Sequence, residues 1–336
     1  MFALLSSERF SNTTPGIEDR SLKQLFNFFS GKCKDPSELL KTPKDFVLES
    51  QSSTQASSHQ VTWLGHSSFL IELEGLKFLT DPVFSKRCSP VKWVGPKRQT
   101  PIPNIKELGK VDFVLISHNH YDHLDKSTVL ALHKHLPTIT WILPEGLCLW
   151  FDKLGIKNTV EIPWWSQWKS ARSNQDIEIT AVPAQHYSGR GLFDRNKSHW
   201  AGFVVEVGIK PKEARFYFAG DTGYNNTDFQ AIGKRFGTMD LSLIPIGAYA
   251  PRKFLGPVHV DPYQAIKVHQ EVGSKLSIGC HWNTFNLSFE DRLRPAYELT
   301  EAKKQAELCD SDFLVLQDRQ SISWGAQALD RMPLKN

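Results

Sequence analysis

The sequence predicts a mixed α/β fold in which two groups of strands are each followed by helices. From Val61 onward, short apolar and β-branched runs recur with turn residues between them. Stretches with helix-capping residues follow these runs. No unit of about 20–50 residues repeats along the chain. A layered α/β architecture is therefore expected.

The first group of strands begins near Val61. "VTWLGHSSFLIEL" (61–73) and "LKFLTDP" (76–82) are predicted to be neighbouring strands, with a turn at Glu74–Gly75. "VDFVLIS" (111–117) is predicted to be a buried strand. The remaining predicted strands are residues 140–144, 159–165, 177–186, 200–207, 215–223, 241–247 and 275–282.

Two helices carry clear start signals. Asp125 is a candidate N-cap for a helix over 126–136, and Pro137 would end it. Asp261–Pro262 supplies an N-cap and a first-turn proline for a helix over 263–272.

Residues 1–60 differ in composition from the rest, so we predict an N-terminal arm and linker at 1–60 and one domain at 61–336. "LKQLFNFFSG" (22–31) could form a short amphipathic helix, and "ESQSSTQASSHQ" (49–60) is a Ser-rich linker candidate. The arm could pack on the domain surface, or it could contact a membrane or a partner.

Composition narrows the class of protein. The chain has 336 residues and a formal charge of +4, which is too small to indicate nucleic-acid binding. No secretory signal and no apolar run long enough to cross a bilayer is found, so we expect a cytoplasmic protein, at most peripheral to a membrane. A monomer and a homodimer are both compatible with the sequence. The odd number of cysteines without C-x-x-C spacing indicates a reducing compartment; they are Cys33, Cys88, Cys148, Cys280 and Cys309.

The stretch "HNHYDH" at 118–123 places three histidines and one aspartate within six positions, directly after a predicted buried strand. Protonated imidazoles at this spacing would repel one another, and neutral ones would gain little from burial. A bound cation removes both difficulties. Isolated histidines are more often hydrogen-bonded core or surface residues, but a cluster of this density favours metal binding.

Other candidate ligands share one feature, because each follows an apolar strand. His118, His186, Asp221 and His281 lie just beyond four different predicted strands. In layered α/β folds such strand ends gather along one edge, where ligand sites form.

These side chains divide into two groups by position. Two residues separated by one other residue on an extended loop point the same way, so His118 and His120 could hold one ion. Imidazole and carboxylate without thiolate suit Zn²⁺, Mn²⁺ or Fe. We predict one ion at His118, His120 and His186, a second at Asp122, His123 and His281, and a bridging carboxylate at Asp221.

The signature H-x-H-x-D-H resembles that of the metallo-β-lactamase superfamily. Within it, the chain looks like the branch of phospholipases D that hydrolyse N-acylphosphatidylethanolamine. The matching segments run in order from about residue 61 to 285 and are "WLGHSSFLIE", "FLTDPVFS", "GPKR", "VLISHNHYDHLD", "FAGDTGY", "GKRFG", "IPIGAY", "HVDP" and "HW-TF". The resemblance implies an αββα sandwich with a dinuclear metal site at the edge of the two sheets, occupied by two divalent ions, most often Zn²⁺.

The resemblance also implies roles for further residues. His66 and Asp81 match positions that orient ligands by hydrogen bonds, although a buried histidine and a turn aspartate before proline are the plain alternatives. His259 matches a position facing the active site, but Val258 stands where the family often has a polar residue. Tyr121 could contact substrate or pack against its own loop.

For function, the resemblance implies hydrolysis of N-acylphosphatidylethanolamine to phosphatidic acid and an N-acylethanolamine. The partner would be a phospholipid, with peripheral membrane contact. Asp122 and Asp221 would steer the attacking water. Two alternatives stay open: hydrolysis of a small soluble phosphate ester, phosphodiester or lactone, and a non-catalytic binding or scaffold role on the same fold.

Two further motifs have more than one interpretation. "PWWSQW" (163–168) could line a lipid groove or form part of the core. Lys97 and Arg98 could receive anionic lipid headgroups or lie on a solvated loop.

Overall fold

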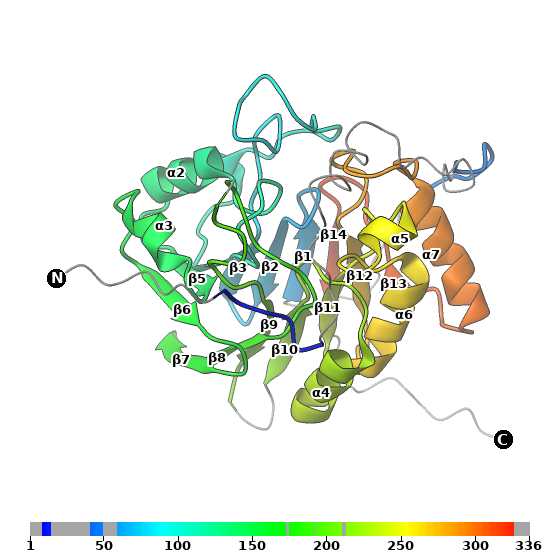
Figure 1. The fold of residues 1–336 in the computed structure, drawn as a ribbon. Coiled ribbons are helices and arrows are strands. Elements are labelled where there is room, and N and C mark those ends of the chain that lie inside the picture. Colours follow the sequence, from blue (N-terminus) through cyan, green and yellow to red (C-terminus); the bar gives the residue numbers. More distant parts are fainter. Residues whose placement is uncertain are drawn as a thin grey trace.

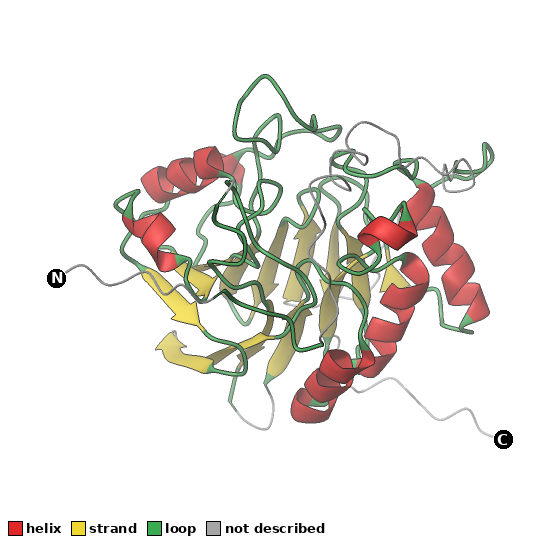
Figure 2. Cartoon of the chain, viewed as in Figure 1, coloured by secondary structure: helices red, strands yellow, loops and turns green. Residues whose placement is uncertain are grey.

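The computed structural model describes residues 9–14, 41–49, 59–172, 175–191, 193–209 and 213–325. Two seven-stranded sheets lie face to face at its centre (Figures 1 and 2). The first sheet has the order β14 (Ser321–Trp324), β1 (His59–Trp63), β2 (Phe69–Leu73), β3 (Leu76–Thr80), β4 (Phe113–Leu115), β5 (Thr140–Pro144), β6 (Thr159–Ile162). The second has the order β13 (Phe313–Leu314), β12 (Ser277–Cys280), β11 (Leu241–Pro245), β10 (Ala214–Phe218), β9 (Gly202–Val207), β8 (Gln175–Val182), β7 (Gln167–Arg172).

Helices cover the outer face of each sheet, which completes the expected αββα sandwich (Figure 2). On the first sheet lie α2 (Lys126–His135) and α3 (Cys148–Asp152), with the short 3-10 helix η2 (Ile105–Glu107) nearby. On the second lie α4 (Asn226–Phe236), α5 (Arg252–Leu255), α6 (Pro262–Glu271) and α7 (Arg294–Gln305).

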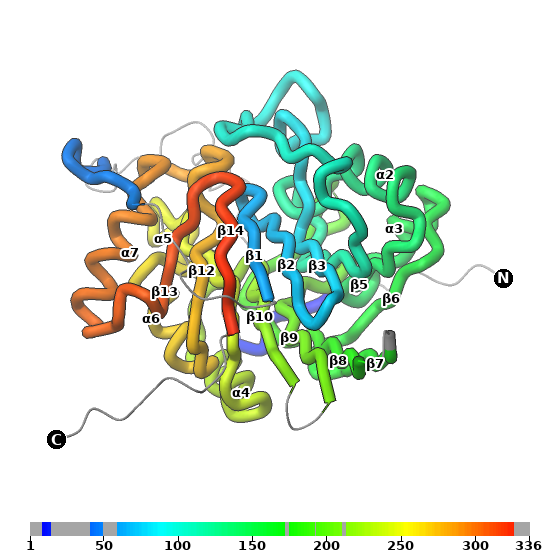
Figure 3. The backbone as a smooth tube through the Cα atoms, turned by 180° about the vertical axis from the view of Figure 1, so that it is seen from behind, coloured from blue at the N-terminus to red at the C-terminus, as the bar shows by residue number. Residues whose placement is uncertain are grey.

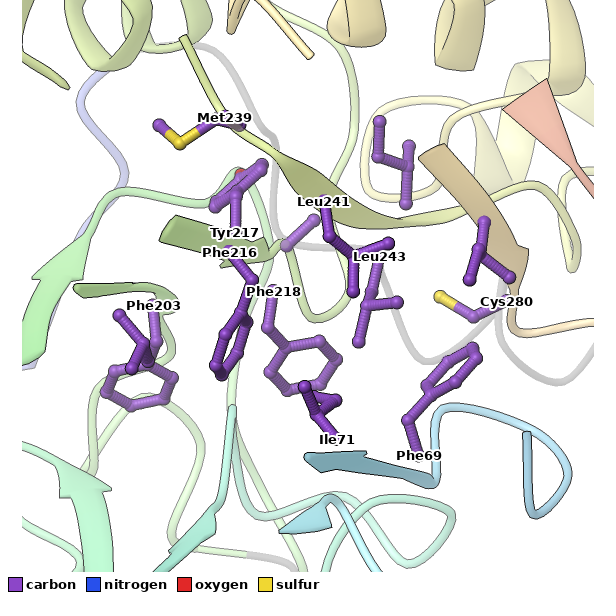
Figure 4. Packing of buried hydrophobic residues seen from close by; sticks show 14 of the residues in the cluster. Phe69, Ile71, Phe203, Phe216, Tyr217, Phe218, Met239, Leu241, Leu243 and Cys280 are labelled. Carbon is purple, nitrogen blue, oxygen red and sulfur yellow. The ribbon is translucent and has the colours of Figure 1, made fainter. Parts of the chain in front are cut away.

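The space between the sheets is filled by aromatic and aliphatic side chains (Figure 4). Phe78 of β3 meets Phe216 of β10 edge to face, with ring centroids 5.4 Å apart, and both rings are fully buried. Burying one such ring stabilises the fold by roughly 1.5–3 kcal/mol. This core fixes how the edges of the two sheets face each other.

Strand direction explains why the candidate ligands meet. β10, β11 and β12 run parallel, and β8 runs the same way as β10 because each pairs antiparallel with β9. Their carboxyl ends therefore share one edge of the second sheet. β4 of the first sheet ends at the same place, where the Ala201 backbone N–H donates to the Ser117 carbonyl over 2.9 Å.

Both predicted helix starts are confirmed. The Asp125 side chain accepts from Ser127 N–H, and Asp261 forms a capping box with Gln264. The predicted turn at Glu74–Gly75 is also confirmed, with both residues at positive φ as the two-residue hairpin turn requires.

The prediction of one strand over 61–73 is wrong. The segment forms β1 and β2, joined by a tight loop in which Ser68 N–H donates to the Gly65 carbonyl. Gly65 (φ 98°) and His66 (φ 55°) have left-handed backbone that interrupts a strand. The outer neighbour of β1 is β14, from the other end of the described chain (Figure 3).

The division of the chain into an arm and a domain at residue 61 stays a prediction. The first strand of the domain, β1, begins two residues earlier, at His59. The expected helix at 22–31 and most of the Ser-rich stretch lie outside the described residues. Two described parts of the arm contact the domain: Phe46 packs against the core, and Phe10 stacks on His199 with ring centroids 4.4 Å apart.

Gly220 tests the junction of the two sheets, because a Cβ there would lie 2.6 Å from Ser117 Cβ. Gly220→Ala should lower the free energy of unfolding by about 1–3 kcal/mol more than Gly75→Ala, measured by urea denaturation. Gly75 is the matched control, because its φ is also positive (+77°) but a Cβ there would meet nothing within 4 Å. Equal losses for the two variants would contradict the close contact.

Candidate metal centre

The loop after β4 carries the densest group of candidate ligands. It folds back on itself, because the N–H groups of His123 and Leu124 both donate to the His120 carbonyl. Asp125 then caps α2, which fixes the end of the loop. Within this turn Asp122 and His120 are partly exposed, whereas His118 and His123 are buried.

A first cluster consists of His118, His120 and His186. His120 Nδ1 lies 2.8 Å from His118 Nε2 and 3.2 Å from His186 Nε2. A tetrahedral ion with nitrogens at about 2.0–2.1 Å would hold them roughly 3.3 Å apart. The three nitrogens therefore converge as ligands around one ion would.

Hydrogen bonds on the far side of two rings fix which nitrogen faces the cluster. The Val258 carbonyl can only accept, so the bond of 3.0 Å to His186 Nδ1 places the proton there. Ser117 Oγ donates to Asp81 Oδ2 and accepts from His118 Nδ1 over 2.9 Å. Both Nε2 atoms consequently present lone pairs to the cluster.

A second cluster consists of His66, Asp122, His123 and His281, whose ligand atoms lie within 4.8 Å of one another. Asp122 Oδ2 lies 3.1, 3.4 and 3.3 Å from the Nε2 atoms of His66, His123 and His281, respectively. His281 Nε2 makes no hydrogen bond with correct alignment among the described residues, although it is buried.

Asp221 lies between the two clusters. Its Oδ2 atom is 3.1 Å from Nε2 of both His123 and His281, 3.7 Å from His186 Nε2 and 4.0 Å from His118 Nε2. Its Oδ1 atom is buried and has no hydrogen-bond partner among the described residues. A carboxylate with this geometry could bridge two ions.

Asp81 holds the metal loop in place from the first sheet. Its carboxylate accepts from Ser117 N–H (2.7 Å), Ser117 Oγ–H (2.5 Å) and His123 Nδ1–H (2.6 Å). Burial raises the pKa of Asp81, and the bonds from His123 and Ser117 oppose that rise. His123 is thereby turned with Nε2 towards Asp221.

Three of these residues have positive φ although they are not glycine: His66 (55°), Asp81 (31°) and His281 (61°). Such backbone costs roughly 1–3 kcal/mol per residue and persists where the surroundings enforce it. The His281 N–H donates to the His66 carbonyl, and Thr284 Oγ1 accepts from His66 N–H, which ties the two strained positions together.

Burial keeps the first cluster neutral. It lowers the pKa of His118 and His186 well below the ordinary value, and it lowers that of His120 to about 4. Burial also lowers the pKa of His66 to about 3. Neutral imidazole is the form that binds metal ions.

The second cluster collects opposite charges. Burial opposes ionisation of Asp122 and Asp221, but His123 and its neighbours outweigh it and hold both pKa values well below the usual range. Burial likewise opposes protonation of His123 and His281, yet Asp221 and Asp122 raise both pKa values, that of His281 to about 9. Two carboxylates thus demand two positive charges here, which a divalent cation would supply.

The structure brings the sequence-predicted residues together at one edge. His259 also faces the site, with Nδ1 3.9 Å from Asp221 Oδ2. Tyr121 lies at the rim, where its hydroxyl donates to the Arg190 carbonyl and its ring lies under the Arg190 guanidinium at 3.9 Å.

Sequence reasoning missed two residues that support the ligands. Ser117 links Asp81 to His118, as described above. Asn12 holds the backbone of His186, accepting from its N–H and donating to its carbonyl, each over 3.0 Å. Ser117 is adjacent to the motif and could have been found from that position. Asn12 lies 174 residues from His186, so no local pattern connects them.

Two other motifs are resolved by their surroundings. The indole rings of "PWWSQW" are half-buried and pack against the core, and Trp164 stacks on His199 at 4.0 Å. Arg98 is buried, contrary to a solvated loop, because its guanidinium donates to the carbonyls of Leu64, Val83 and Pro101.

The chain matches the family model described as "Beta-lactamase superfamily domain" over residues 77–282. It is 41% identical over 263 residues to N-acyl-phosphatidylethanolamine-hydrolyzing phospholipase D 1 of Caenorhabditis elegans. The alignment covers 76% of this chain and 73% of that protein. It is 38% identical over 240 residues to the mitochondrial N-acyl-phosphatidylethanolamine-hydrolyzing phospholipase D of Saccharomyces cerevisiae. That alignment covers 71% of this chain and 50% of that protein. More distant is a UPF0173 metal-dependent hydrolase of Caldivirga maquilingensis, 32% identical over 66% of this chain and 82% of that protein.

Solved structures share the fold at lower identity. Igni18, a metallo hydrolase from Ignicoccus hospitalis, aligns with a TM-score of 0.59 and 19% identity over 81% of this chain and all of that chain. An isothiocyanate hydrolase from Delia radicum gut bacteria aligns with a TM-score of 0.60 and 17% identity over 80% of this chain and all of that chain.

Asp81→Asn tests whether the buried carboxylate orients the ligands. Removing its charge should weaken metal binding by about 10–100-fold, because His123 loses its fixed orientation. The measurement is competition with a chromophoric chelator. Asp112→Asn is the control, since Asp112 is a buried aspartate directly before β4, where its carboxylate accepts from Lys77 N–H and pairs with Lys110. Equal affinity of the Asp81→Asn variant and the wild type would contradict the assignment.

Proposed function

Since this chain belongs to the beta-lactamase superfamily and is a metal-dependent hydrolase, we propose that it is a phospholipase D that hydrolyses N-acylphosphatidylethanolamine. The products are phosphatidic acid and an N-acylethanolamine. The observation that carries the substrate is the 41% identity to the nematode phospholipase over three-quarters of the chain. The chemistry is supported independently by the converging imidazoles and carboxylates.

The donor set fits two divalent cations, and we propose zinc for both. His118, His120 and His186 would hold one, Asp122, His123 and His281 the other, and Asp221 would contact both. Imidazole nitrogen with a few carboxylate oxygens and no thiolate is a donor set that zinc accepts. Bound there, the ions would lower the pKa of water and neutralise charge on the phosphate.

The remaining steps fall to the protein's own groups. Asp122 is the more exposed carboxylate, with 16% of its side chain accessible, so it can meet both water and substrate. Asp221 Oδ1 has no hydrogen-bond partner among the described residues and can accept a hydrogen bond from the attacking water. We assign both carboxylates the task of orienting this water in line with the scissile P–O bond.

His259 and Tyr121 would contact the substrate at the rim of the metal centre. His259 stands next to Asp221, so its ring can donate to a phosphate oxygen or to the departing one. The Tyr121 hydroxyl donates to the Arg190 carbonyl and the Arg190 guanidinium covers one ring face, so the hydroxyl oxygen, as an acceptor, is what Tyr121 can offer to substrate. We assign His66 the task of orienting Asp122 through Nε2.

His120→Gln tests the metal-dependent reaction. It should lower kcat/KM for release of N-acylethanolamine from vesicles by more than about 100-fold, since a direct ligand matters more than its supporting bonds. His135→Gln is the control, because His135 is exposed at the end of α2 in the same segment. Unchanged activity of the His120→Gln variant would remove His120 from the site.

Chelation and an alternative substrate separate the proposal from its rivals. EDTA should abolish hydrolysis, and added Zn²⁺ should restore it with about two equivalents bound. A soluble phosphodiester turned over faster than vesicle lipid would favour a small-molecule hydrolase. Metal binding without hydrolysis of either substrate would favour a binding protein.

A further inference from the structure

A loop beside the metal centre carries exposed apolar and basic side chains at its tip. We call residues 85–97 the basic loop (cyan, at the top of Figure 1). Trp93 is 77% exposed, Val94 51% and Val91 36%. Three exposed apolar side chains within four positions form a contiguous patch, and such a patch marks an interaction surface more than a single exposed residue does.

The basic loop is held in one conformation by its own backbone. Cys88 N–H donates to the Pro96 carbonyl over 3.2 Å, and Arg98 N–H donates to the Lys86 carbonyl over 2.9 Å. The Arg87 guanidinium donates to the Gly95 carbonyl. These bonds close the loop at its base, so the exposed tip is presented by a fixed support.

Both roots of the basic loop are attached to the metal centre. Ser85 N–H donates to Asp125 Oδ2, at the end of the metal loop. On the other side Arg98 bridges to Phe285, whose ring lies 5.2 Å from that of His66. Phe285 and Cys88 also pack with Tyr121. The tip therefore projects from the edge at which Asp122 is accessible.

The charge of this segment has one sign. Between Asp81 and Glu107 the sequence has no acidic residue. The basic loop itself contributes Lys86, Arg87, Lys92 and Lys97, and the three lysines are exposed. An anionic surface would be attracted by these side chains, and an aromatic ring between them suits the boundary of a lipid bilayer.

We propose that the basic loop docks the enzyme on an anionic phospholipid surface, with Trp93 inserted at the interface and the lysines on headgroups. Stable peripheral attachment takes two signals, an apolar one and a polybasic one, and the basic loop supplies both. Among the described residues, no helix is long and apolar enough to span a bilayer. The docking is argued from the basic loop alone. Its purpose, to bring the metal centre to a membrane lipid, rests on the proposed function.

The test is binding of the full-length, zinc-loaded protein to sedimented vesicles that contain no N-acylphosphatidylethanolamine. One set is phosphatidylcholine with phosphatidylglycerol, the other phosphatidylcholine alone. Trp93→Ala should lower binding to the anionic set by about tenfold. Lys92→Gln should lower it by about fivefold, with a loss that shrinks as salt is added.

Ile209→Ala is the matched control. Ile209 is 67% exposed and follows β9, at the opposite edge of the second sheet from the metal centre. It should bind vesicles like the wild type. In a second readout, Trp93→Ala should lower kcat/KM on vesicle substrate while leaving turnover of a soluble diester unchanged.

Three results would overturn the proposal: wild-type binding by both loop variants, an equal loss for Ile209→Ala, or a change in oligomeric mass of Trp93→Ala without a change in vesicle binding. The last would make the basic loop a contact between copies. Loop-dependent vesicle binding without release of N-acylethanolamine would support the docking surface and contradict only the substrate.

Discussion

The structure depends on a group of converging imidazoles and carboxylates whose charges and lone pairs a bound cation would balance. Nitrogen lone pairs of His118 and His186 point at His120 Nδ1 from about 3 Å, and the buried Asp221 carboxylate stands next to them. Without cations the carboxylates must draw protons onto His123 and His281. A polypeptide would not keep this arrangement in its interior for stability, since buried unpaired polar groups cost free energy. The edge of the sandwich is therefore built for ions, and the surrounding fold serves to hold it.

Holding it requires the two sheets to be locked at that edge. The Asp81 carboxylate, in the first sheet, fixes Ser117 and His123, while Gly220 lets the strand end that bears Asp221 approach Ser117 closely. The core between the sheets sets the distance over which these contacts form. Residues that never touch a substrate consequently determine the positions of those that do. The strained backbone at His66, Asp81 and His281 is the visible cost of that precision.

The sequence was informative where local chemistry decides the outcome. The six-residue cluster, the capping aspartates and the two-residue hairpin turn depend on neighbours in sequence, and each was predictable. The strand over 61–73 was predicted wrongly, because its apolar pattern continues through Gly65 and His66, where the backbone turns. Long-range contacts left no signal at all: Asn12 holding His186, and β14 completing the first sheet beside β1, arise only when distant segments meet. The burial of Arg98 was not predictable for the same reason, since the three carbonyls that accept from its guanidinium meet only in the folded chain.

The residues that bind ions and the residues that we propose contact a lipid surface lie in different parts of this molecule. The ion-binding groups lie on strand ends of a rigid core, which is why distant relatives with the same fold are metal-dependent hydrolases. For the proposed phospholipid substrate, the groups that select it must lie outside that core, on segments whose change does not disturb the ligands. The basic loop meets this condition, since its roots are bonded to Asp125 and Phe285 while the apolar side chains at its tip are exposed. A change at the tip should thus alter binding to a lipid surface and leave the metal-binding side chains in place.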